Sequence, residues 1–572
     1  MQRLLCAAGL LALSQVAYTQ ATCSDSFTPI TAEDFVASLH PGWNLGNTLD
    51  AIPDEGSWNN APVEGTTLDI IKESGFKSVR LPVTWTHHFT SESPDWTVDP
   101  EWLQRVSDVV DLITDRDFYA IVNVHHDSWE WADVTAADAN LTLIEEKFYR
   151  LWYQIGTTLG CKSSLVAFES INEPPADTAE DGAEINKLNG IFLQAIADAG
   201  GFNSERVVNL VGGGQDSIKT SQWFEVPEGI TNPWAIQFHY YSPYDFIFSA
   251  WGKTIWGSST DKDTLTTDFE LIHSNFTSVP LILGEYDASP TNTEPAARWK
   301  YFDHLQQVAS QFNIATVIWD NGADHLDRTT GQWRDPVSLG IVTGTVEGTA
   351  NSLPDSTEDA SATEQWSSAY IFHKTGESVE EQTLPYLFNG NSLVSVTDSS
   401  GSVLASGTDY TVTTESIVFT TAYLSSKYTS STSPGLIDKL TLSFSGGASS
   451  PTIEIIVWDT PTLSSTSASA SAVSGSDLSI PISWAGIAKP AAVKALSTSG
   501  IYIFDDWTQY LGPLQQARAT YSSHFNWDAD NVIITTAAID AVVAVGESTV
   551  FTFEFYPRIN GTENAVEFTL TV

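Results

Sequence analysis

The stretch GWNLGN at residues 42–47 contains the first of eight short apolar runs, and it decides between two folds. The runs alternate with amphipathic segments of helical spacing, such as 102–115 and 143–159, which predicts parallel strands joined by crossover helices. A doubly wound open sheet would usually carry a glycine-rich phosphate loop after its first strand, and residues 42–47 form no such loop. We therefore predict an α/β fold, a (β/α)8 TIM barrel over residues 20–365. Its expected strands are 42–45, 78–83, 119–124, 165–170, 206–211, 235–238, 281–283 and 315–318.

The composition changes after residue 365, where Thr, Ser, Val and Gly become frequent. Alternating runs such as 393–396, separated by turn dipeptides such as Asn389-Gly390, predict an all-β sandwich over 368–458. A Ser/Thr-rich stretch predicts a flexible linker at 459–477, and residues 478–572 are expected to form a second small β-sandwich. We find no internal repeat that would make the two β units copies of each other.

The charge balance excludes several classes of partner. The 572 residues include 25 Lys and Arg against 71 Asp and Glu, which gives a formal net charge of −46. Such a surface repels phosphate backbones and anionic lipid, so we expect no nucleic acid and no membrane partner. The 20 tryptophans suit a carbohydrate ligand, whose C–H faces stack on flat rings, although a large core also buries tryptophan.

The first residues predict the compartment. Arg3 is followed by a short apolar stretch at 4–13 and then by small or polar residues, the pattern of a secretory signal peptide over 1–19. We therefore expect a secreted, extracellular protein. The sequons at Asn140, Asn275 and Asn560 are compatible with glycosylation.

Two cysteines remain after removal of that segment, Cys23 and Cys161. An even pair in an oxidising compartment predicts one disulfide, with two buried free thiols as the alternative. Both cysteines are expected at the amino-terminal end of the barrel, Cys23 before strand one and Cys161 before strand four. Neither lies beside a motif that would make it a nucleophile.

Functional side chains of such a barrel gather at the carboxyl ends of its strands. In this sequence those positions hold a consistent polar and aromatic set. The set is Asn44, Arg80, His125, His126, Asn172, Glu173, His239, Tyr241, Glu285 and Trp319.

Two members of this set are carboxylates that follow apolar strands directly. Glu173 ends strand four and Glu285 ends strand seven, so the two side chains can face each other across the barrel mouth. Paired carboxylates are what glycoside hydrolysis requires, one as an acid and one as a base or nucleophile. The plainer interpretation makes them buried ion-pair partners of Arg80 and His239, which is less expected for two such residues at once.

The adjacent histidines His125 and His126 raise the question of a metal. Neighbouring residues on a strand point to opposite faces, so we expect that the two rings cannot reach one ion. A metal hydrolase also needs a third ligand close by. We therefore predict no metal site.

Seven motifs occur in order over some 300 residues and resemble glycoside hydrolase family 5, in particular its endo-β-1,4-glucanases. They are GWNLGNT (42–48), RLPVTW (80–85), HHD (125–127), INEP (171–174), HYY (239–241), GE (284–285) and WDNG (319–322). The resemblance implies that Glu173 is the general acid/base and Glu285 the nucleophile of a retaining enzyme without a cofactor. It implies a substrate-binding role for Arg80, His125, Asn172, His239, Tyr241 and Trp319, to which we add Asn44 and His126.

The resemblance extends to the β units. Residues 368–458 are similar to an immunoglobulin-like module, and 478–572 loosely resemble carbohydrate-binding module family 46. Trp507 and Trp527 have polar neighbours, which indicates loops. We expect the last module to fold back beside the barrel mouth, where one of these rings extends the cleft.

The expected function is therefore a monomeric, secreted endo-β-1,4-glucanase. Its partner is a β-glucan such as cellulose, mixed-linkage glucan or xyloglucan. The alternatives are a β-mannanase or a dedicated xyloglucanase on the same scaffold, and a non-catalytic glycan-binding protein. The Glu173/Glu285 pair argues against the last.

Overall fold

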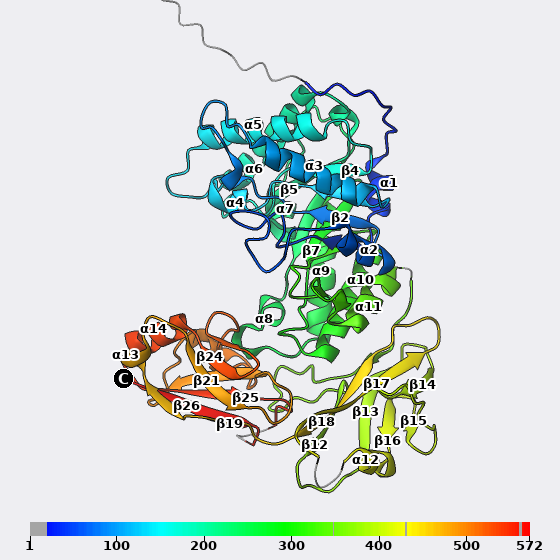
Figure 1. Ribbon diagram of the computed structural model, residues 1–572, viewed down its shortest axis with the longest axis vertical. Coiled ribbons are helices and arrows are strands. Elements are labelled where there is room, and N and C mark those ends of the chain that lie inside the picture. The colour runs from blue at the N-terminus through cyan, green and yellow to red at the C-terminus, as the bar shows by residue number, and fades with distance from the viewer. Residues whose placement is uncertain (1–19, 347, 429–431, 560–562) are drawn as a thin grey trace, which may run out of the picture.

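The computed structural model describes residues 20–346, 348–428, 432–559 and 563–572. These residues form one barrel and two β-sandwich modules, which lie side by side below the barrel in Figure 1. The predicted signal peptide and Asn560 lie outside the described residues. Among the helices of the described part, none is long and apolar enough to cross a membrane.

The barrel is closed and its eight strands follow one another in chain order, all parallel, which confirms the predicted fold class. Helices cover the outer face of the sheet, so the strands are buried on both faces and consist largely of apolar residues. The strands are β1 (Gly42–Asn44), β2 (Ser78–Leu81), β3 (Tyr119–Val122), β4 (Val166–Glu169), β5 (Val208–Asp216), β6 (Trp234–Tyr240), β7 (Leu281–Tyr286) and β8 (Ala315–Ile318).

The helices begin where the sequence places capping residues. Thr178 and Asp181 form a capping box at the start of α6, and Pro100 is the first residue of α3. The helices of the barrel are α1 (Ala32–Ala37), α2 (Gly65–Glu73), α3 (Pro100–Thr114), α4 (Asp127–Glu130), α5 (Leu141–Leu159), α6 (Ala179–Ala199), α7 (Ser217–Trp223), α8 (Tyr244–Ile247), α9 (Ser259–Asn275), α10 (Pro295–Gln311) and α11 (Pro336–Val346).

The N-terminal segment is tied to the amino-terminal end of the barrel. Cys23 and Cys161, the pair predicted from the sequence, form a disulfide across 138 residues. Cys161 follows α5 and precedes β4, so the bond anchors the segment on the side opposite the strand ends that carry the site.

The second module has its own apolar core between two four-stranded sheets. It begins earlier than predicted, because β11 already pairs with β13 before residue 368. The first sheet contains β11 (Leu353–Pro354), β13 (Gln382–Leu387), β16 (Ser416–Phe419) and β15 (Tyr410–Val412). The second contains β12 (Tyr370–Lys374), β18 (Thr452–Trp458), β17 (Gly435–Phe444) and β14 (Leu393–Thr397), and α12 (Thr421–Lys427) joins the sheets.

The third module also begins earlier than predicted, inside the expected linker 459–477. That stretch forms β19, β20 and α13 (Ala470–Val473), because its backbone pairs with β21 and β26. Small Ser, Thr and Ala side chains suit a flexible linker, but they fit a sheet edge equally well. Its first sheet contains β19 (Thr462–Leu463), β21 (Leu478–Ser483), β24 (Asn531–Ile534) and β23 (Phe525–Trp527). Its second sheet contains β20 (Ser467–Ser469), β26 (Ala565–Thr571), β25 (Thr549–Glu554) and β22 (Ala492–Ser497).

The two modules share one topology, which the sequence did not reveal. In each module the first, third, sixth and fifth strands form one sheet, and the second, eighth, seventh and fourth form the other. The second and eighth strands are parallel in both, and a helix follows the sixth strand in both (α12, and α14 at Thr536–Val545). The two β units are therefore structural copies with unlike sequences.

The third module packs against the barrel loop 244–256, next to α8 (Figure 1). The Trp251 indole donates to Asp505 at 2.7 Å, and its ring meets Trp507 edge-on with the centroids 4.5 Å apart. On the same interface the buried Arg558 donates to the Gly252 carbonyl and the Thr254 hydroxyl. These contacts fix the module beside the mouth of the barrel.

Candidate active site

A cleft of about 650 Å³ lies at the carboxyl ends of the barrel strands. Glu173 and Glu285 both line it, together with aromatic side chains that include Trp129, Tyr244 and Trp319. Residues 520–523 of the third module form part of its wall. None of the described residues that line the cleft is Lys or Arg, so its charge comes from carboxylates and histidines.

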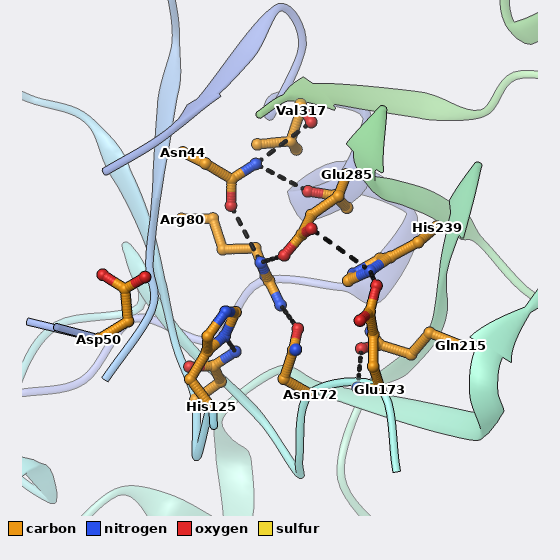
Figure 2. A network of polar contacts seen from close by, with 12 residues as sticks. Asn44, Asp50, Arg80, His125, Asn172, Glu173, Gln215, His239, Glu285 and Val317 are labelled. Carbon is orange, nitrogen blue, oxygen red and sulfur yellow. Dashed lines mark hydrogen bonds and ion pairs between the residues drawn. The ribbon is translucent and has the colours of Figure 1, made fainter. Parts of the chain in front are cut away.

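Glu285 is held by two donors at the end of β7. Arg80 Nη1 lies 2.5 Å from its Oε1 (Figure 2), and the Tyr241 hydroxyl donates to its Oε2 at 2.8 Å. Burial raises the pKa of Glu285 and nearby Glu173 adds to this, whereas His239 and Arg80 favour the ionised form. Burial also raises the pKa of Tyr241 well above its ordinary value, so the hydroxyl stays a donor.

Arg80 lies under the site rather than on its wall. Its guanidinium has five N–H groups and all five are bonded: to Glu285, to Asn44 Oδ1, to Asn172 Oδ1 and twice to Glu169. Asn44 is equally buried, and its amide donates to strand carbonyls of β7 and β8. Both residues were predicted to contact substrate, but their burial assigns them to positioning instead.

Glu173 reaches into the cleft from the loop after β4. Its carboxylate lies 2.7 Å from His239 Nδ1, and its backbone N–H donates to Gln215 Oε1 at 2.7 Å. The residue has a φ of 38°, a left-handed conformation that the surrounding bonds must hold in place. Single oxygens of Glu173 and Glu285 and a nitrogen of His239 lie within 4.8 Å of one another.

His125 and Trp319 form one face of the cleft. Their rings are parallel with the centroids 6.0 Å apart. Asn123 Oδ1 accepts from the Val83 N–H, so Asn123 Nδ2 is the donor that lies 3.0 Å from His125 Nδ1. Burial lowers the pKa of His125 well below its usual value, which makes the ring neutral with its proton on Nε2. This nitrogen is therefore a donor, suited to a sugar hydroxyl.

His126 also lines the cleft, between the rings of Trp58 and Trp129. The expectation that His125 and His126 point apart is wrong, since ligand atoms of both and of Asp50 lie within 4.8 Å of one another. The strand ends at Val122, and the chain turns into α4 before the alternation of a strand would apply. The proton that Asn123 places on His125 Nε2 leaves this ring a poor metal ligand.

Three positioning residues were missed by the sequence reasoning. They are Glu169 at the end of β4, Gln215 at the end of β5 and Asn123 after β3. Glu169 had a visible signal, because it is a charged residue inside the apolar run 165–170. Asn123 had a similar but weaker signal, since it is a neutral polar residue inside the expected strand 119–124, whereas Gln215 lies beyond the expected strand 206–211 and had none.

The third module reaches the cleft through residues other than the two predicted tryptophans. Trp507 packs on Trp251, and Trp527 packs on Tyr521 with the ring centroids 4.6 Å apart. Tyr521 and its neighbours 520–523 line the cleft instead. Trp507 lies in the connection between β22 and β23, as expected, but the expected loop position of Trp527 is wrong, since it is the last residue of β23. The sequence also did not show that the barrel supplies a ring to cover Trp507.

Comparison with known proteins gives two family matches. Residues 43–325 match the cellulase model of glycosyl hydrolase family 5, and residues 365–455 match the carbohydrate binding domain X2. The second match covers the module predicted as immunoglobulin-like. The third module has the sandwich form expected from the sequence, and its likeness to module family 46 stays a prediction.

One solved relative is likewise tri-modular and aligns along nearly the whole chain. A tri-modular subfamily 4 endo-β-1,4-glucanase from Bacillus licheniformis is 32% identical, with a TM-score of 0.83 over 95% of this chain and 100% of the other. It has also been solved with cellotetraose. Endoglucanase B of Paenibacillus lautus is 28% identical over 461 residues, 77% of this chain and 78% of the relative.

A family 5 xyloglucanase from Paenibacillus pabuli resembles the barrel alone. It is 26% identical with a TM-score of 0.51, over 55% of this chain and 99% of the other. The barrel, the paired carboxylates at its mouth and these matches agree, and the chain belongs to glycosyl hydrolase family 5, the family of the endoglucanases to which it is similar.

Proposed function

We propose that this protein hydrolyses internal β-1,4-glucosidic bonds of a neutral β-glucan with retention of anomeric configuration. The observation that carries the proposal is the closeness of the two carboxylates, with single oxygens of Glu173 and Glu285 within 4.8 Å. Retaining glycosidases place their carboxyl groups about 5–5.5 Å apart, whereas inverting ones leave about 6.5–9.5 Å for a water. The separation therefore supports direct attack by one carboxylate.

Glu285 is the nucleophile of this reaction. Arg80 and Tyr241 each bond one of its oxygens, which stabilises the ionised form and orients it. In the first step its oxygen bonds the anomeric carbon while the bond to the leaving oxygen breaks, and Glu173 gives that oxygen its proton. The product of this step is a glycosyl–Glu285 ester and a shortened chain.

The second step uses Glu173 as a base. Now ionised, it takes a proton from water, whose oxygen attacks the anomeric carbon as the ester to Glu285 breaks. Glu173 is thereby reprotonated and Glu285 regains its charge. Asn172 Oδ1 accepts from Arg80, which leaves the amide nitrogen free to donate to the sugar 2-hydroxyl. Trp319 offers its ring face to the sugar at the cleavage point.

The cleft favours a neutral polymer. Its described lining residues supply carboxylates, histidines and rings but no Lys or Arg, so an anionic glycan would be repelled. The cellotetraose complex of the Bacillus licheniformis relative supports a β-1,4-glucan. The Paenibacillus pabuli relative supports xyloglucan as a second substrate for the same two carboxylates.

We further propose that the enzyme acts outside the cell as a monomer. The signal-like residues 1–19 and the disulfide of Cys23 with Cys161 support secretion. Asn140 and Asn275 are exposed, as glycosylation requires, and with Asn560 they remain the proposed sites. Light scattering of the secreted protein tests the monomer, and the mass before and after glycosidase treatment tests the glycans.

The test of function compares soluble glucans with mannan. Wild type should release reducing ends from carboxymethyl cellulose, mixed-linkage glucan and xyloglucan, and NMR should show the β-anomer as the first product. Glu285→Ala and Glu173→Ala should each lose roughly 10⁴-fold or more of kcat without a change in unfolding temperature. Azide should restore turnover of Glu285→Ala with an α-linked product. Wild-type rates in either variant, or cleavage of mannan alone, would overturn the proposal.

A further inference from the structure

A third carboxylate lies directly beneath the two catalytic ones. Glu169 is the last residue of β4 and has no solvent exposure. Its side chain accepts four bonds: from Arg80 Nε and Nη2 at 2.7 Å each, and from the amides of Asn123 and Gln215 at 3.3 Å each. A buried carboxylate with four donors is fully engaged, and each donor leads to a different part of the site.

The first connection leads to the nucleophile. Because Glu169 takes Nε and one Nη2 hydrogen of Arg80, the planar guanidinium has only one orientation left. In that orientation Nη1 faces Glu285 and the remaining Nη2 hydrogen faces Asn172. The position of Glu169 therefore decides where the nucleophile and the neighbouring amide are held.

The second connection leads to the acid. The Gln215 amide donates to Glu169 with its nitrogen, and this leaves its oxygen to accept from the Glu173 backbone N–H. Gln215 and Glu173 have φ angles of 49° and 38°, so both ends of this bond are in strained, left-handed backbone. If the Gln215 amide were turned the other way, its NH2 group would face the Glu173 backbone N–H. The bond that holds the loop carrying Glu173 would then be lost.

The third connection leads to the cleft wall. Asn123 Nδ2 is shared between Glu169 and His125 Nδ1, and this donor fixes the tautomer of the His125 ring. Arg80 also carries the only positive charge among these partners, and it lies between two carboxylates, Glu169 and Glu285. The negative charge of Glu169 therefore weakens the electrostatic stabilisation that Arg80 gives to ionised Glu285.

We infer that Glu169 is a positioning residue that sets the nucleophile, the acid/base loop and the His125 tautomer from one buried point. The inference deepens the proposed function, on which it rests. It requires the charge as well as the shape of the side chain, because all four bonds to Glu169 come from N–H donors, two of Arg80 and one each of Asn123 and Gln215. An isosteric glutamine would set an N–H group against at least one of them.

The experiment uses Glu169→Gln in the full chain. On soluble β-glucan its kcat should fall by about 100-fold or more, as expected for sub-ångström misplacement of reacting groups, while KM stays within about threefold. Loss of a negative charge also favours ionisation of Glu285 and Glu173, so both limbs of the kcat–pH profile should move to lower pH. Glu169→Asp keeps the charge with a shorter reach, and it should recover part of kcat with the profile in its original place.

A matched control separates positioning from stability. Asp335 is another buried carboxylate paired with an arginine, Arg298, at 2.7 Å, and it lies outside the site. Asp335→Asn should lower the unfolding temperature without moving the pH profile. A Glu169→Gln enzyme with the wild-type profile, and with kcat lowered only in proportion to its folded fraction, would overturn the inference.

A crystal structure of Glu169→Gln needs no substrate and therefore distinguishes this inference from the proposed function. We expect a turned Gln215 amide or a displaced Glu173 loop. Unchanged positions of Arg80, Gln215 and Glu173 would refute the positioning role even if the wild-type enzyme cleaved some other glycan.

Discussion

The two β modules have the same strand order, the same parallel strand pair and a helix at the same place, yet they relate differently to the cleft. Among the described residues, none of the second module lines the cleft, while 520–523 of the third do. The part of the third module that reaches the cleft belongs to one connection, between the fourth and fifth strands. This connection covers residues 398–409 in the second module and 498–524 in the third, more than twice the length.

The longer connection holds most of what touches the barrel. Asp505 and Trp507 meet Trp251, Gln515 Nε2 donates to Asp245, and Tyr521 lines the cleft. In the second module the corresponding loop contains exposed residues such as Val403. One scaffold therefore serves as a spacer or as a wall of the site according to a single loop, which is where functional differences between copies are expected.

Deleting residues 460–572 should give the largest effect on this comparison. We expect activity on xyloglucan and mixed-linkage polymer to fall by about 10- to 100-fold, since only long chains contact both the barrel and the module. Hydrolysis of a short cello-oligosaccharide should fall much less. The two sets of kcat/KM values check this, and an equal loss on both substrates would make the module a stabiliser of the barrel.

Trp251→Ala should separate the docked module from the barrel with a smaller effect. The change removes a ring contact with Trp507 and a hydrogen bond to Asp505, together about 1–3 kcal/mol. Calorimetry should show the third module unfolding at a lower temperature, and polymer activity should fall severalfold. Val403→Ala, in the matching loop of the second module, is the control and should change neither quantity.

Tyr521→Ala tests the cleft wall alone. Loss of one stacking ring costs about 1 kcal/mol, so kcat/KM on polymeric glucan should drop about fivefold through KM. The change also removes the ring contact with Trp527, so the unfolding temperature of the third module should fall slightly while that of the barrel stays near that of wild type. Tyr521→Phe keeps the ring and should behave as wild type. A normal KM in the alanine variant would show that residues 520–523 border the cleft without binding the chain.

The smallest expected effect is a pH dependence of stability that the barrel should show and the second module should not. Burial by itself lowers the pKa of His325, but Asp287, 2.6 Å away, and two further carboxylates raise it to about 9. The folded barrel holds a proton that the unfolded chain releases near pH 6.5. This stabilisation is complete below pH 6.5 and is lost as the pH rises to 9.

Thermal unfolding between pH 7 and 9 checks this assignment. Over that interval the wild-type barrel transition should shift down by a few degrees relative to that of His325→Gln, a comparison that cancels the opposite contribution of Lys147, whose pKa burial lowers to about 8. The second module contains one histidine, His373, which is not paired with a carboxylate among the described ion pairs, so its transition should stay in place. An equal pH dependence of the barrel transition in wild type and in His325→Gln would contradict the role of His325.

The sequence predicted the barrel and the position of two carboxylates at its mouth, because both follow from local rules. Apolar runs mark strands buried on two faces, and residues close to the carboxyl end of such a strand lie at the mouth, as Glu173 in the loop after β4 and Glu285 near the end of β7 do. The sequence was a weaker guide to which of the strand-end side chains face the cleft. Asn44 and Arg80 stand at strand ends but point under the site, and only the three-dimensional packing of their partners shows this.

The sequence predicted that both β modules are sandwiches. It did not predict where each module begins, or that the two share one topology. The edge strands β19 and β20 are short and rich in small residues, so the chain carries no hydrophobic alternation there. The common topology is held by backbone pairing, which unlike sequences satisfy equally well. The docking surface depends on the contact between Trp251 and Trp507. These residues lie far apart in the chain, so the sequence alone does not show that their rings pack together.

The order of synthesis gives this interface a further consequence. Ser249 and Trp251 have φ angles of 47° and 51°, conformations that non-glycine residues rarely hold unaided, and their partners 505–521 lie near the end of the chain. A ribosome therefore delivers the barrel with this loop unsupported and supplies the support last. A polypeptide that lacks residues 505–521 would leave Ser249 and Trp251 without these contacts and the cleft without residues 520–523 of its wall.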